Sequence, residues 1–430
     1  MISQFYVADN THSNQDIEKV LNIDEFIPKY QSYQKLLYGP WGVPENDKIP
    51  PVKVEKGVIQ PPSGINHEKA VDAIVGSIMT SAVMDMVGVG VEFINGVVAK
   101  PLLLGNLNIS WTHPRSNFHN RVFTRGTSTD DTSQCILIMR TIVDLNNNNN
   151  NKNIKEYESS SKSFNVDNVK IDPKKFASEL LNWIDYGHRE HKQNKGLGIG
   201  ATTSFVVYHP KYLQDPIYCA KDAWIEMGKT AAPNGSVMRI ASSGCFAFWD
   251  EKVVIQNADK YAKVTHADPR CVYSSIAAAL LIARYIQWNA GLRGEEEPNI
   301  DEALNEALNY VPEIDEYKSD INFYSNCKTV EELKLSGDDK IGYCLKAFGS
   351  AIWALRYCNS IEEGLTKVIR EGGDADTNGA VVGALLGAKF GFNKIPKEFI
   401  EYMFVGQWMF REITPYIELM GLKMIPSPYI

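Results

Sequence analysis

The ten residues from Gly379 to Ala388, GAVVGALLGA, constrain the fold more than any other segment of the chain. Small residues recur every four positions, at 379, 383 and 387 and again at 380, 384 and 388, which is the spacing of one helical face. Each glycine costs about 1 kcal/mol of helix propensity relative to alanine, so something else must compensate. The pattern predicts a rigid, centrally packed helix whose small-residue face lets a neighbouring backbone approach closely.

Two aspartates, Asp374 and Asp376, stand just before this helix and follow the glycines at 372 and 373. If the segment is locally extended, their carboxylates point the same way, and the glycines let the backbone turn sharply. This arrangement suits a hard cation. The same residues would also serve as ordinary helix caps, and the segment alone leaves both interpretations open.

A second acidic cluster, Thr129-Asp130-Asp131-Thr132, opens another predicted helix. Adjacent residues on a helix do not share a face, so both aspartates can address one site only at the mouth of the helix. The field of the helix N-terminus favours them there, although simple capping remains an alternative. If folding brings the two clusters together, only divalent cations make such crowding tolerable. Oxygen ligands favour Mg²⁺, Mn²⁺ or Ca²⁺ over Zn²⁺.

Most of the remaining chain also predicts helices. Asp-Pro pairs at 172–173, 215–216 and 268–269 place an aspartate at the cap and a proline in the first turn. Capping-box spacing occurs at 329–332 and 360–363. Strand-like alternation is confined to 97–104 and 203–208, and no fixed-period repeat is visible. We therefore expect an all-α, compact, orthogonal multi-helix globule.

Composition divides the chain into a main domain and two accessory segments. Residues 1–65 are polar and rich in proline, and we expect an N-terminal extension of unknown role before a domain at 66–430. The segment 146–163 begins with six consecutive asparagines and continues with serines. Such a composition buries too little apolar surface to offset chain entropy, which predicts a disordered insertion.

Charge and cysteine usage narrow the class of protein. A net charge of −8 without a basic stripe argues against a nucleic-acid partner. We find no leader and no apolar run of membrane-spanning length, so we expect a soluble, cytoplasmic protein, and a monomer. The seven cysteines are scattered and contain no CxxC pair, which is typical of reduced core residues rather than disulfides or a zinc site.

Taken in order, these motifs resemble the ADP-ribosylglycohydrolase family, which includes the ADP-ribosylarginine and ADP-ribosylserine hydrolases and the dinitrogenase reductase-activating glycohydrolase. The similarity covers about 66–392, and its C-terminal signature lies in 342–392. The other matching segments are Asp85-Met-Val-Gly-Val-Gly-Val-Glu92, Thr129-Asp-Asp-Thr132, Asn234-Gly-Ser-Val-Met-Arg239 and Thr265-His266 with Asp268-Pro-Arg270.

The resemblance implies an all-α hydrolase with two Mg²⁺ ions, or Mn²⁺ as a substitute, in a cleft. The metal ligands would be Thr129, Asp130, Asp131, Asp374, Asp376 and Thr377. The metals would hold the distal ribose of an ADP-ribosyl group and orient the attacking water. Asp131 and Glu92 would act in catalysis, with the role of Glu92 open between proton handling and metal contact.

For the substrate, the resemblance assigns ADP-ribose contacts to Asn234, Gly235, Ser236 and His266. From the residues alone, the first three could form a plain Asn-Gly turn, and His266 could be a capping or core histidine. In one glycine-rich loop the chain departs from the family, which often has an acidic residue where Gly198 stands. This difference bears on which leaving group is accepted.

The leading hypothesis is a Mg²⁺-dependent hydrolase that removes ADP-ribose from a modified protein side chain or from a small conjugate. One alternative is a non-catalytic ADP-ribose-binding or structural, crystallin-like protein on the same fold. Another is a phosphatase or nuclease, because paired Mg²⁺ ions also serve phosphoryl chemistry. The sequence does not decide among arginine, serine, an acetyl ester or a nucleic-acid end as the leaving group.

Overall fold

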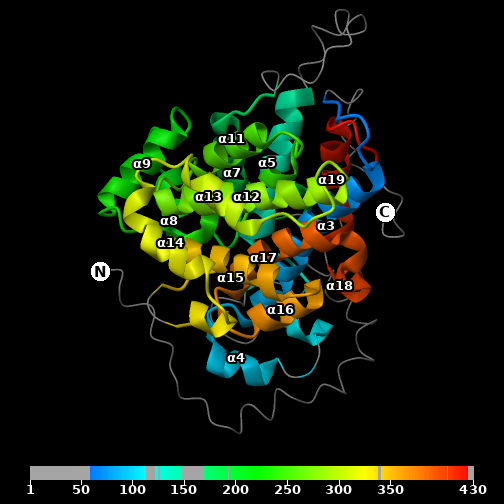
Figure 1. The fold of residues 1–430 in the computed structure, drawn as a ribbon. Helices are drawn as coiled ribbons and strands as arrows, with labels where there is room; N and C mark the ends of the chain where they lie inside the picture. The colour runs from blue at the N-terminus through cyan, green and yellow to red at the C-terminus, as the bar shows by residue number, and fades with distance from the viewer. Residues whose placement is uncertain are drawn as a thin grey trace, which may run out of the picture.

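The computed structural model describes residues 59–103, 105, 107–112, 122–123, 126–147, 169–191, 193–337, 340–403 and 405–424. Over these residues the regular secondary structure is helical apart from two short strands, which confirms the predicted all-α class (Figure 1). The N-terminal extension up to residue 58 and the predicted insertion from 148 to 163 lie outside the described residues, whereas residues 146 and 147, which were predicted to begin the insertion, end helix α5.

The α-helices are α3 (His67–Gly88), α4 (Gly96–Leu102), α5 (Asp130–Asn147), α7 (Pro173–Tyr186), α8 (Ala201–Val207), α9 (Pro216–Glu226), α10 (Ala241–Cys245), α11 (Glu251–Ala262), α12 (Pro269–Asn289), α13 (Ile300–Leu308), α14 (Lys318–Ser325), α15 (Cys344–Tyr357), α16 (Ile361–Ile369), α17 (Ala375–Phe390), α18 (Lys397–Tyr402) and α19 (Gly406–Leu419). Shorter 3₁₀ turns are η1 (Val89–Val91), η2 (Ile109–Thr112), η5 (Arg189–His191), η6 (Asn234–Ser236), η7 (Ile314–Tyr317), η8 (Val330–Leu333) and η9 (Phe392–Lys394). Two short strands, β1 (Ile94–Asn95) and β2 (Gly372–Gly373), form one antiparallel pair.

Helices α17 and α3 pack against each other more extensively than any other pair in the described structure. The predicted glycine row faces the α3 backbone. A Cβ at Gly383 would lie 2.5 Å from the Thr80 carbonyl oxygen, and one at Gly387 would lie 2.1 Å from that of Gly76. No side chain fits at these distances, so the sequence pattern of α17 is explained by backbone-to-backbone contact.

Most of the predicted caps are confirmed. The side chains of Asp172, Asp215 and Asp268 each accept a hydrogen bond from a backbone N–H in the first turn of α7, α9 and α12. Ser360 caps α16 in the same way. The exception is Thr329, which makes no cap hydrogen bond and precedes the 3₁₀ turn η8 rather than an α-helix.

Both strand predictions are wrong. Residues 97–104 and 203–208 fall mainly in the short helices α4 and α8. An isolated strand needs a partner to satisfy its backbone groups, and neither segment has one, whereas a helix satisfies them internally. In α4 the Asn95 side chain also accepts a hydrogen bond from the Val97 N–H at 2.9 Å, which fixes the start of the helix.

Among the described residues, two helices have the length and apolar composition to cross a membrane, contrary to the expectation from the sequence. They are the segments His67–Val91 and Pro269–Asn289, with mean hydropathies of 1.7 and 1.2. In the first, 100% of the apolar window is buried inside the fold, and in the second, 94%. They are therefore the core helices of this globule, and their composition reflects burial on all sides.

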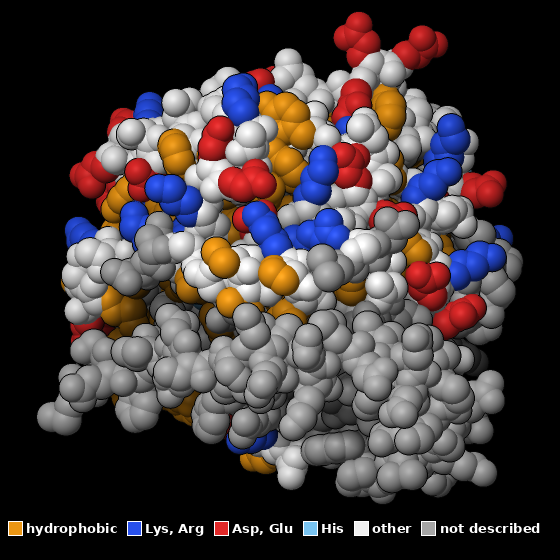
Figure 2. All heavy atoms as spheres, turned by 90° about the horizontal axis from the view of Figure 1, so that it is seen from below, with side chains coloured by type: hydrophobic (Ala, Val, Ile, Leu, Met, Phe, Trp, Pro, Cys, Tyr) orange, Lys and Arg blue, Asp and Glu red, His pale blue; other side chains and the backbone are white. Residues whose placement is uncertain are grey.

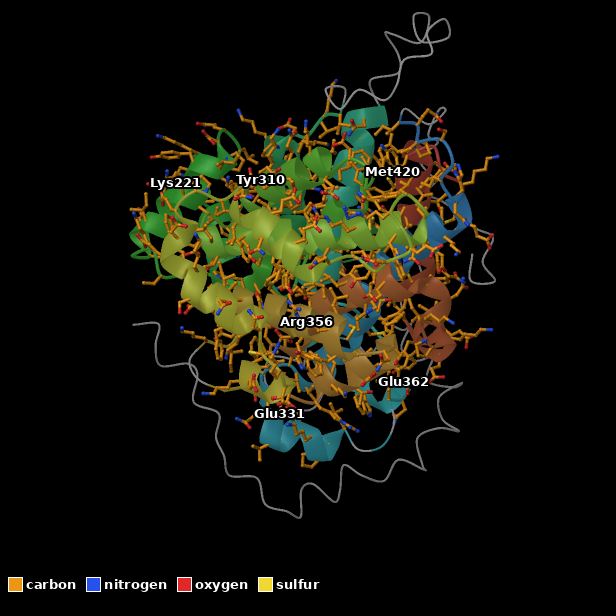
Figure 3. The ribbon with its side chains drawn as sticks, in the orientation of Figure 1. Lys221, Tyr310, Glu331, Arg356, Glu362 and Met420 are labelled. Carbon is orange, nitrogen blue, oxygen red and sulfur yellow. The ribbon has the colours of Figure 1, made fainter. Side chains whose placement is uncertain are left out.

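The remaining features of the fold concern its surface charges, the start of the described chain and the cysteines. On the face shown in Figure 2, Lys and Arg side chains lie among Asp and Glu side chains rather than in a basic stripe. Lys100 on α4 contacts Glu331, at the lower edge of Figure 3, at 3.8 Å and Glu371 at 2.6 Å. The start of the described chain is anchored where the Ile59 N–H donates to the Leu419 carbonyl. All seven cysteines are buried and free, as predicted.

Candidate metal centre

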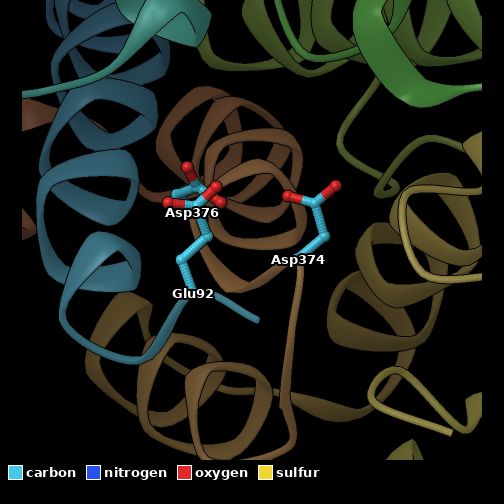
Figure 4. Close-up of side chains that lie close together, drawn as sticks. All are labelled: Glu92, Asp374 and Asp376. Carbon is cyan, nitrogen blue, oxygen red and sulfur yellow. The ribbon is translucent and has the colours of Figure 1, made fainter. Parts of the chain in front are cut away.

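Two segments meet beside the N-terminus of α17 and bring three carboxylates together. The first leads from η1 into β1 and carries Glu92, and the second is β2 with the start of α17, which carries Asp374 and Asp376. The oxygens that these three carboxylates offer lie within 4.8 Å of one another, and all three residues are buried. In Figure 4 the carboxylates of Glu92 and Asp376 lie together, with Asp374 facing them from the other side.

The glycine pair Gly372-Gly373 makes this approach possible. Both residues have positive φ, +63° and +72°, where side-chain-bearing residues are strained. A Cβ at Gly372 would lie 2.1 Å from the Ile94 carbonyl oxygen. The Phe93 N–H donates to the Gly373 carbonyl at 2.6 Å, which fixes the residue after Glu92 against the residue before Asp374.

The sequence analysis considered an extended segment for Asp374 and Asp376. In the structure the segment is not extended. Asp374 stands just before the helix and Asp376 lies in its first turn. Nor does Asp374 cap the helix, because its side chain makes no cap hydrogen bond. Its Oδ2 instead accepts a hydrogen bond from Asn234 Nδ2 at 2.9 Å. Capping therefore does not explain this aspartate.

The two acidic clusters meet, which the sequence alone could not establish. Asp131 is at the start of α5, and its Oδ1 accepts a hydrogen bond from the Thr377 hydroxyl at 3.3 Å. The Thr129 hydroxyl, rather than a carboxylate, accepts the Asp131 N–H at 3.3 Å. Asp130 and Asp131 thus remain available for the shared site. All six predicted metal ligands are buried, and they lie in or just before the first turns of α5 and α17.

A further aspartate, Asp85 on α3, holds the segment from Thr129 to Thr132 in place. Its carboxylate accepts the backbone N–H groups of Thr129 and Thr132 at 3.0 and 3.1 Å and the Thr132 hydroxyl at 2.6 Å. Burial raises the pKa of Asp85 to about 6, although these hydrogen bonds lower it. Asp85 therefore fixes the start of α5, and its charge adds to the repulsion felt by Asp130 and Asp131.

The carboxylates of the cluster lie close enough to repel one another. Burial, followed by repulsion from neighbouring carboxylates, raises the pKa of Asp130, Asp131 and Asp376 well above the ordinary value of 3.8. Asp131 Oδ2 and Asp376 Oδ1 are buried without a hydrogen-bond partner among the described residues. Converging, unpartnered carboxylate oxygens with threonine hydroxyls beside them are the donor set of a hard divalent cation, so the residues fit a metal.

Comparison with known proteins agrees with this geometry. Residues 66–421 match the ADP-ribosylglycohydrolase family. The chain belongs to this family. It is 25% identical over 246 residues to an uncharacterised protein of Archaeoglobus fulgidus, covering 55% of this chain and 70% of that one. It is also 25% identical over 259 residues to ADP-ribosylhydrolase ARH3 of Bos taurus, covering 51% of this chain and 68% of the relative.

The fold is shared with solved structures as well. The chain is similar to an ADP-ribosylglycohydrolase-related protein complex, with a TM-score of 0.51 and 20% sequence identity, covering 83% of this chain and 100% of the other. The sequence-based assignment to the ADP-ribosylglycohydrolase family is therefore confirmed, and the protein is a glycohydrolase-type hydrolase by membership.

The Asn234 loop of this ADP-ribosylglycohydrolase lies directly beside the carboxylates. It is the 3₁₀ turn η6 rather than an isolated Asn-Gly turn, and Asn234, Gly235 and Ser236 are all buried. Asn234 holds Asp374, whereas the Ser236 hydroxyl is turned toward the Cys271 carbonyl at 3.3 Å. The structure thus places all three near the cluster and gives the first a contact with a candidate ligand.

The His266 ring packs against this loop at Gly235. A Cβ at Gly235 would lie 2.8 Å from His266 Cε1, so glycine allows the ring to pack flat against the turn. Burial and the nearby Arg239 lower the pKa of His266 to about 3, which keeps the ring neutral. Thr265 Oγ1 accepts a hydrogen bond from Arg239 and shares a second one with His266 Nδ1 at 2.7 Å.

Gly198 explains the departure from the family in the glycine-rich loop. It has a φ of +92°, and a Cβ there would lie 2.6 Å from Asp130 Oδ1. With this backbone conformation, an acidic side chain at position 198 would clash with the Asp130 carboxylate. The loop therefore contacts Asp130 through the backbone of Gly198.

Sequence reasoning missed Gln134. This buried side chain donates from Nε2 to Asp130 Oδ2 at 2.8 Å. Gln134 follows Asp130 by four positions on α5, so helical spacing could have drawn attention to the pair. Arg239, by contrast, was part of a recognised motif, and the structure shows it to be fully buried and bonded internally.

Proposed function

We propose that this protein is a Mg²⁺-dependent hydrolase that cleaves the bond at the distal ribose of an ADP-ribosyl group. The observation that carries the proposal is the meeting of both acidic clusters at one buried site with unpartnered oxygens. Family membership supports the hydrolase class, and the all-oxygen donor set favours Mg²⁺ or Mn²⁺ over zinc.

Two ions would be held by three candidate ligands at the start of α5, Thr129, Asp130 and Asp131, and three at the start of α17, Asp374, Asp376 and Thr377. When bound, they would offset the buried negative charge and polarise oxygens of the substrate. The protein side chains would orient the distal ribose and exclude bulk water, because every one of these residues is buried. Asn234 would keep Asp374 aligned through its amide.

Proton handling falls to the carboxylates nearest the reacting centre. Asp131 Oδ2 is buried with no hydrogen-bond partner in the described part of the chain, so it is placed to accept a proton from an attacking water. Glu92 lies within reach of the same centre, on the segment between η1 and β1. We assign Asp131 as the principal base and Glu92 as a second catalytic carboxylate.

The substrate would be an ADP-ribosylated protein or a small ADP-ribose conjugate. The turn η6 would receive the ADP-ribose moiety, with backbone groups of Gly235 and Ser236 facing its phosphates. We expect the protein to act as a soluble, cytoplasmic monomer. A phosphatase or nuclease would have the same need for paired cations, but the family match favours ADP-ribose.

The deciding experiment offers the purified full chain a panel of ADP-ribosylated substrates carrying arginine, serine, acetyl-ester and nucleic-acid linkages. Release of free ADP-ribose is followed with Mg²⁺ and after chelation. We expect release from at least one substrate, only with the metal. Binding of ADP-ribose without release from any substrate would favour the non-catalytic alternative, and metal-independent release would refute the metal centre.

A further inference from the structure

Arg239 is a buried cation behind the candidate metal centre. Its side chain is among the largest that are fully buried, with 1% of the residue exposed. Among the described residues its hydrogen bonds go to neutral oxygens, namely Gln134 Oε1 at 2.5 Å, the Tyr261 carbonyl at 2.8 Å and Thr265 Oγ1 at 2.7 Å. Its guanidinium also stacks over the Phe176 ring at 5.1 Å. It is therefore fixed on several sides.

A buried cation without a directly bonded carboxylate is costly, unless nearby negative charge offsets it. Here that charge lies one side chain away. Gln134 stands between Arg239 and Asp130, with Oε1 toward the guanidinium and Nε2 at 2.8 Å from Asp130 Oδ2. The guanidinium thus reaches the acidic cluster through an amide.

The direction of this relay is fixed by chemistry. Arginine has only donors, so the amide oxygen of Gln134 must face Arg239, and the amide nitrogen must then face Asp130. A flipped amide would set donor against donor at one end and acceptor against acceptor at the other. Gln134 therefore always presents a donor to Asp130 Oδ2, which leaves Oδ1 on the side of Gly198.

We propose that Gln134 is a positioning residue of the metal centre. Its amide, oriented by Arg239, ties Asp130 Oδ2 and holds Oδ1 toward the site, and so raises the affinity of the protein for divalent cations. This inference rests on the proposed metal-dependent function. Residues that orient a ligand carboxylate typically contribute about 10- to 100-fold in metal affinity or activity.

The test measures Mn²⁺ binding to the full chain by isothermal titration calorimetry, with no substrate present. Gln134→Met keeps the length of the side chain and removes the amide. Gln134→Glu retains an oxygen for Arg239 but faces Asp130 with an acceptor instead of a donor. Gln287→Met is the matched control, because Gln287 is also buried and donates from Nε2 to the Phe248 carbonyl on another helix, α12.

We expect Gln134→Met to weaken Mn²⁺ binding by about 10- to 100-fold. Gln134→Glu should weaken it at least as much, and Gln287→Met should leave it unchanged. If Gln134 served only to satisfy Arg239, Gln134→Glu would bind Mn²⁺ like the parent, and this result would overturn the proposal. Should Gln134→Met fail to fold by circular dichroism, Gln134→Glu decides alone.

Failure of the wider function has a different signature. If the parent bound no Mn²⁺ at all, the metal centre and the positioning role would both be lost. If the parent bound Mn²⁺ and the Gln134 variants bound it equally well, only the positioning role would be lost. Binding of Mn²⁺ with the expected variant effects, but without release of ADP-ribose from any substrate, would uphold the positioning role and reject the proposed reaction.

Discussion

Asp376→Asn is expected to stabilise the metal-free protein and to abolish its response to divalent cations. The carboxylate oxygens of Glu92, Asp374 and Asp376 lie within 4.8 Å of one another. At 4.8 Å and an effective dielectric of about 20, two ionised carboxylates repel each other by about 3.5 kcal/mol. Protonation of some carboxylates limits the total repulsion in the cluster. We therefore expect the variant to gain about 3 kcal/mol of unfolding free energy, close to the repulsion of one such pair, at pH values where the cluster is ionised.

The gain should grow with pH. Burial and neighbouring charges raise the folded-state pKa of Asp376 well above its ordinary value of 3.8, so the folded state binds more protons than the unfolded state. This contribution to stability is therefore fully present below the unfolded pKa and is lost as pH rises through the folded pKa. Asparagine at 376 removes the group, so the difference in unfolding free energy between variant and parent should increase over that window.

The assay is denaturant unfolding in chelator from about pH 5 to about pH 8, with Mg²⁺ added in a second series. Asp259→Asn is the control, because Asp259 forms a surface ion pair with Lys263 and its change should stay within about 0.5 kcal/mol. The parent should gain stability from Mg²⁺, and the Asp376 variant should not. A variant that is less stable than the parent in chelator at every pH would refute the reasoning.

Four other perturbations test separate parts of the structure. Gly383→Ala should lower the unfolding free energy by about 1–3 kcal/mol, because its Cβ would meet the α3 backbone, whereas Gly364→Ala meets the movable end of the Leu386 side chain and should cost less. Asn234→Ala frees Asp374 and should weaken Mn²⁺ binding in calorimetry; unchanged binding would mean that this hydrogen bond holds nothing. His188→Phe should flatten the acid side of the stability profile. Burial lowers the pKa of His188 from 6.5 to about 3, so its contribution is lost as pH falls below 6.5, and a parallel profile would contradict this. Deleting 148–163 should leave turnover close to that of the parent while Asn146 keeps its bonds to Lys170, and a large loss would show that the segment is not inert.

Local chemistry in the sequence predicted part of this structure well. The glycines of α17 and the Asp-Pro caps act within one or two turns of backbone, so their consequences follow from spacing alone. The strand predictions at 97–104 and 203–208 were wrong because alternation says nothing about whether a partner strand exists. Spacing left the conformation around Asp374 open, because its turn depends on the contacts of Gly372 and Gly373 with distant residues.

The site was predicted as a set of residues, whereas its assembly was not. Thr377 and Asp131 are 246 positions apart, and no local pattern reports that contact. Resemblance to a family supplied the pairing of the two clusters, and the structure supplied the contacts that hold them. Gln134 was missed because a glutamine in a helix has no chemical signal of its own until its partners Asp130 and Arg239 are known.

The backbone contact between α3 and α17 also limits how this protein can move. At Gly76 and Gly387 neither helix can slide or tilt without driving main chain into main chain. The carboxylates at the N-terminus of α17 are therefore held by a rigid helix pair. Any motion that opens the site therefore has to come from segments outside this helix pair.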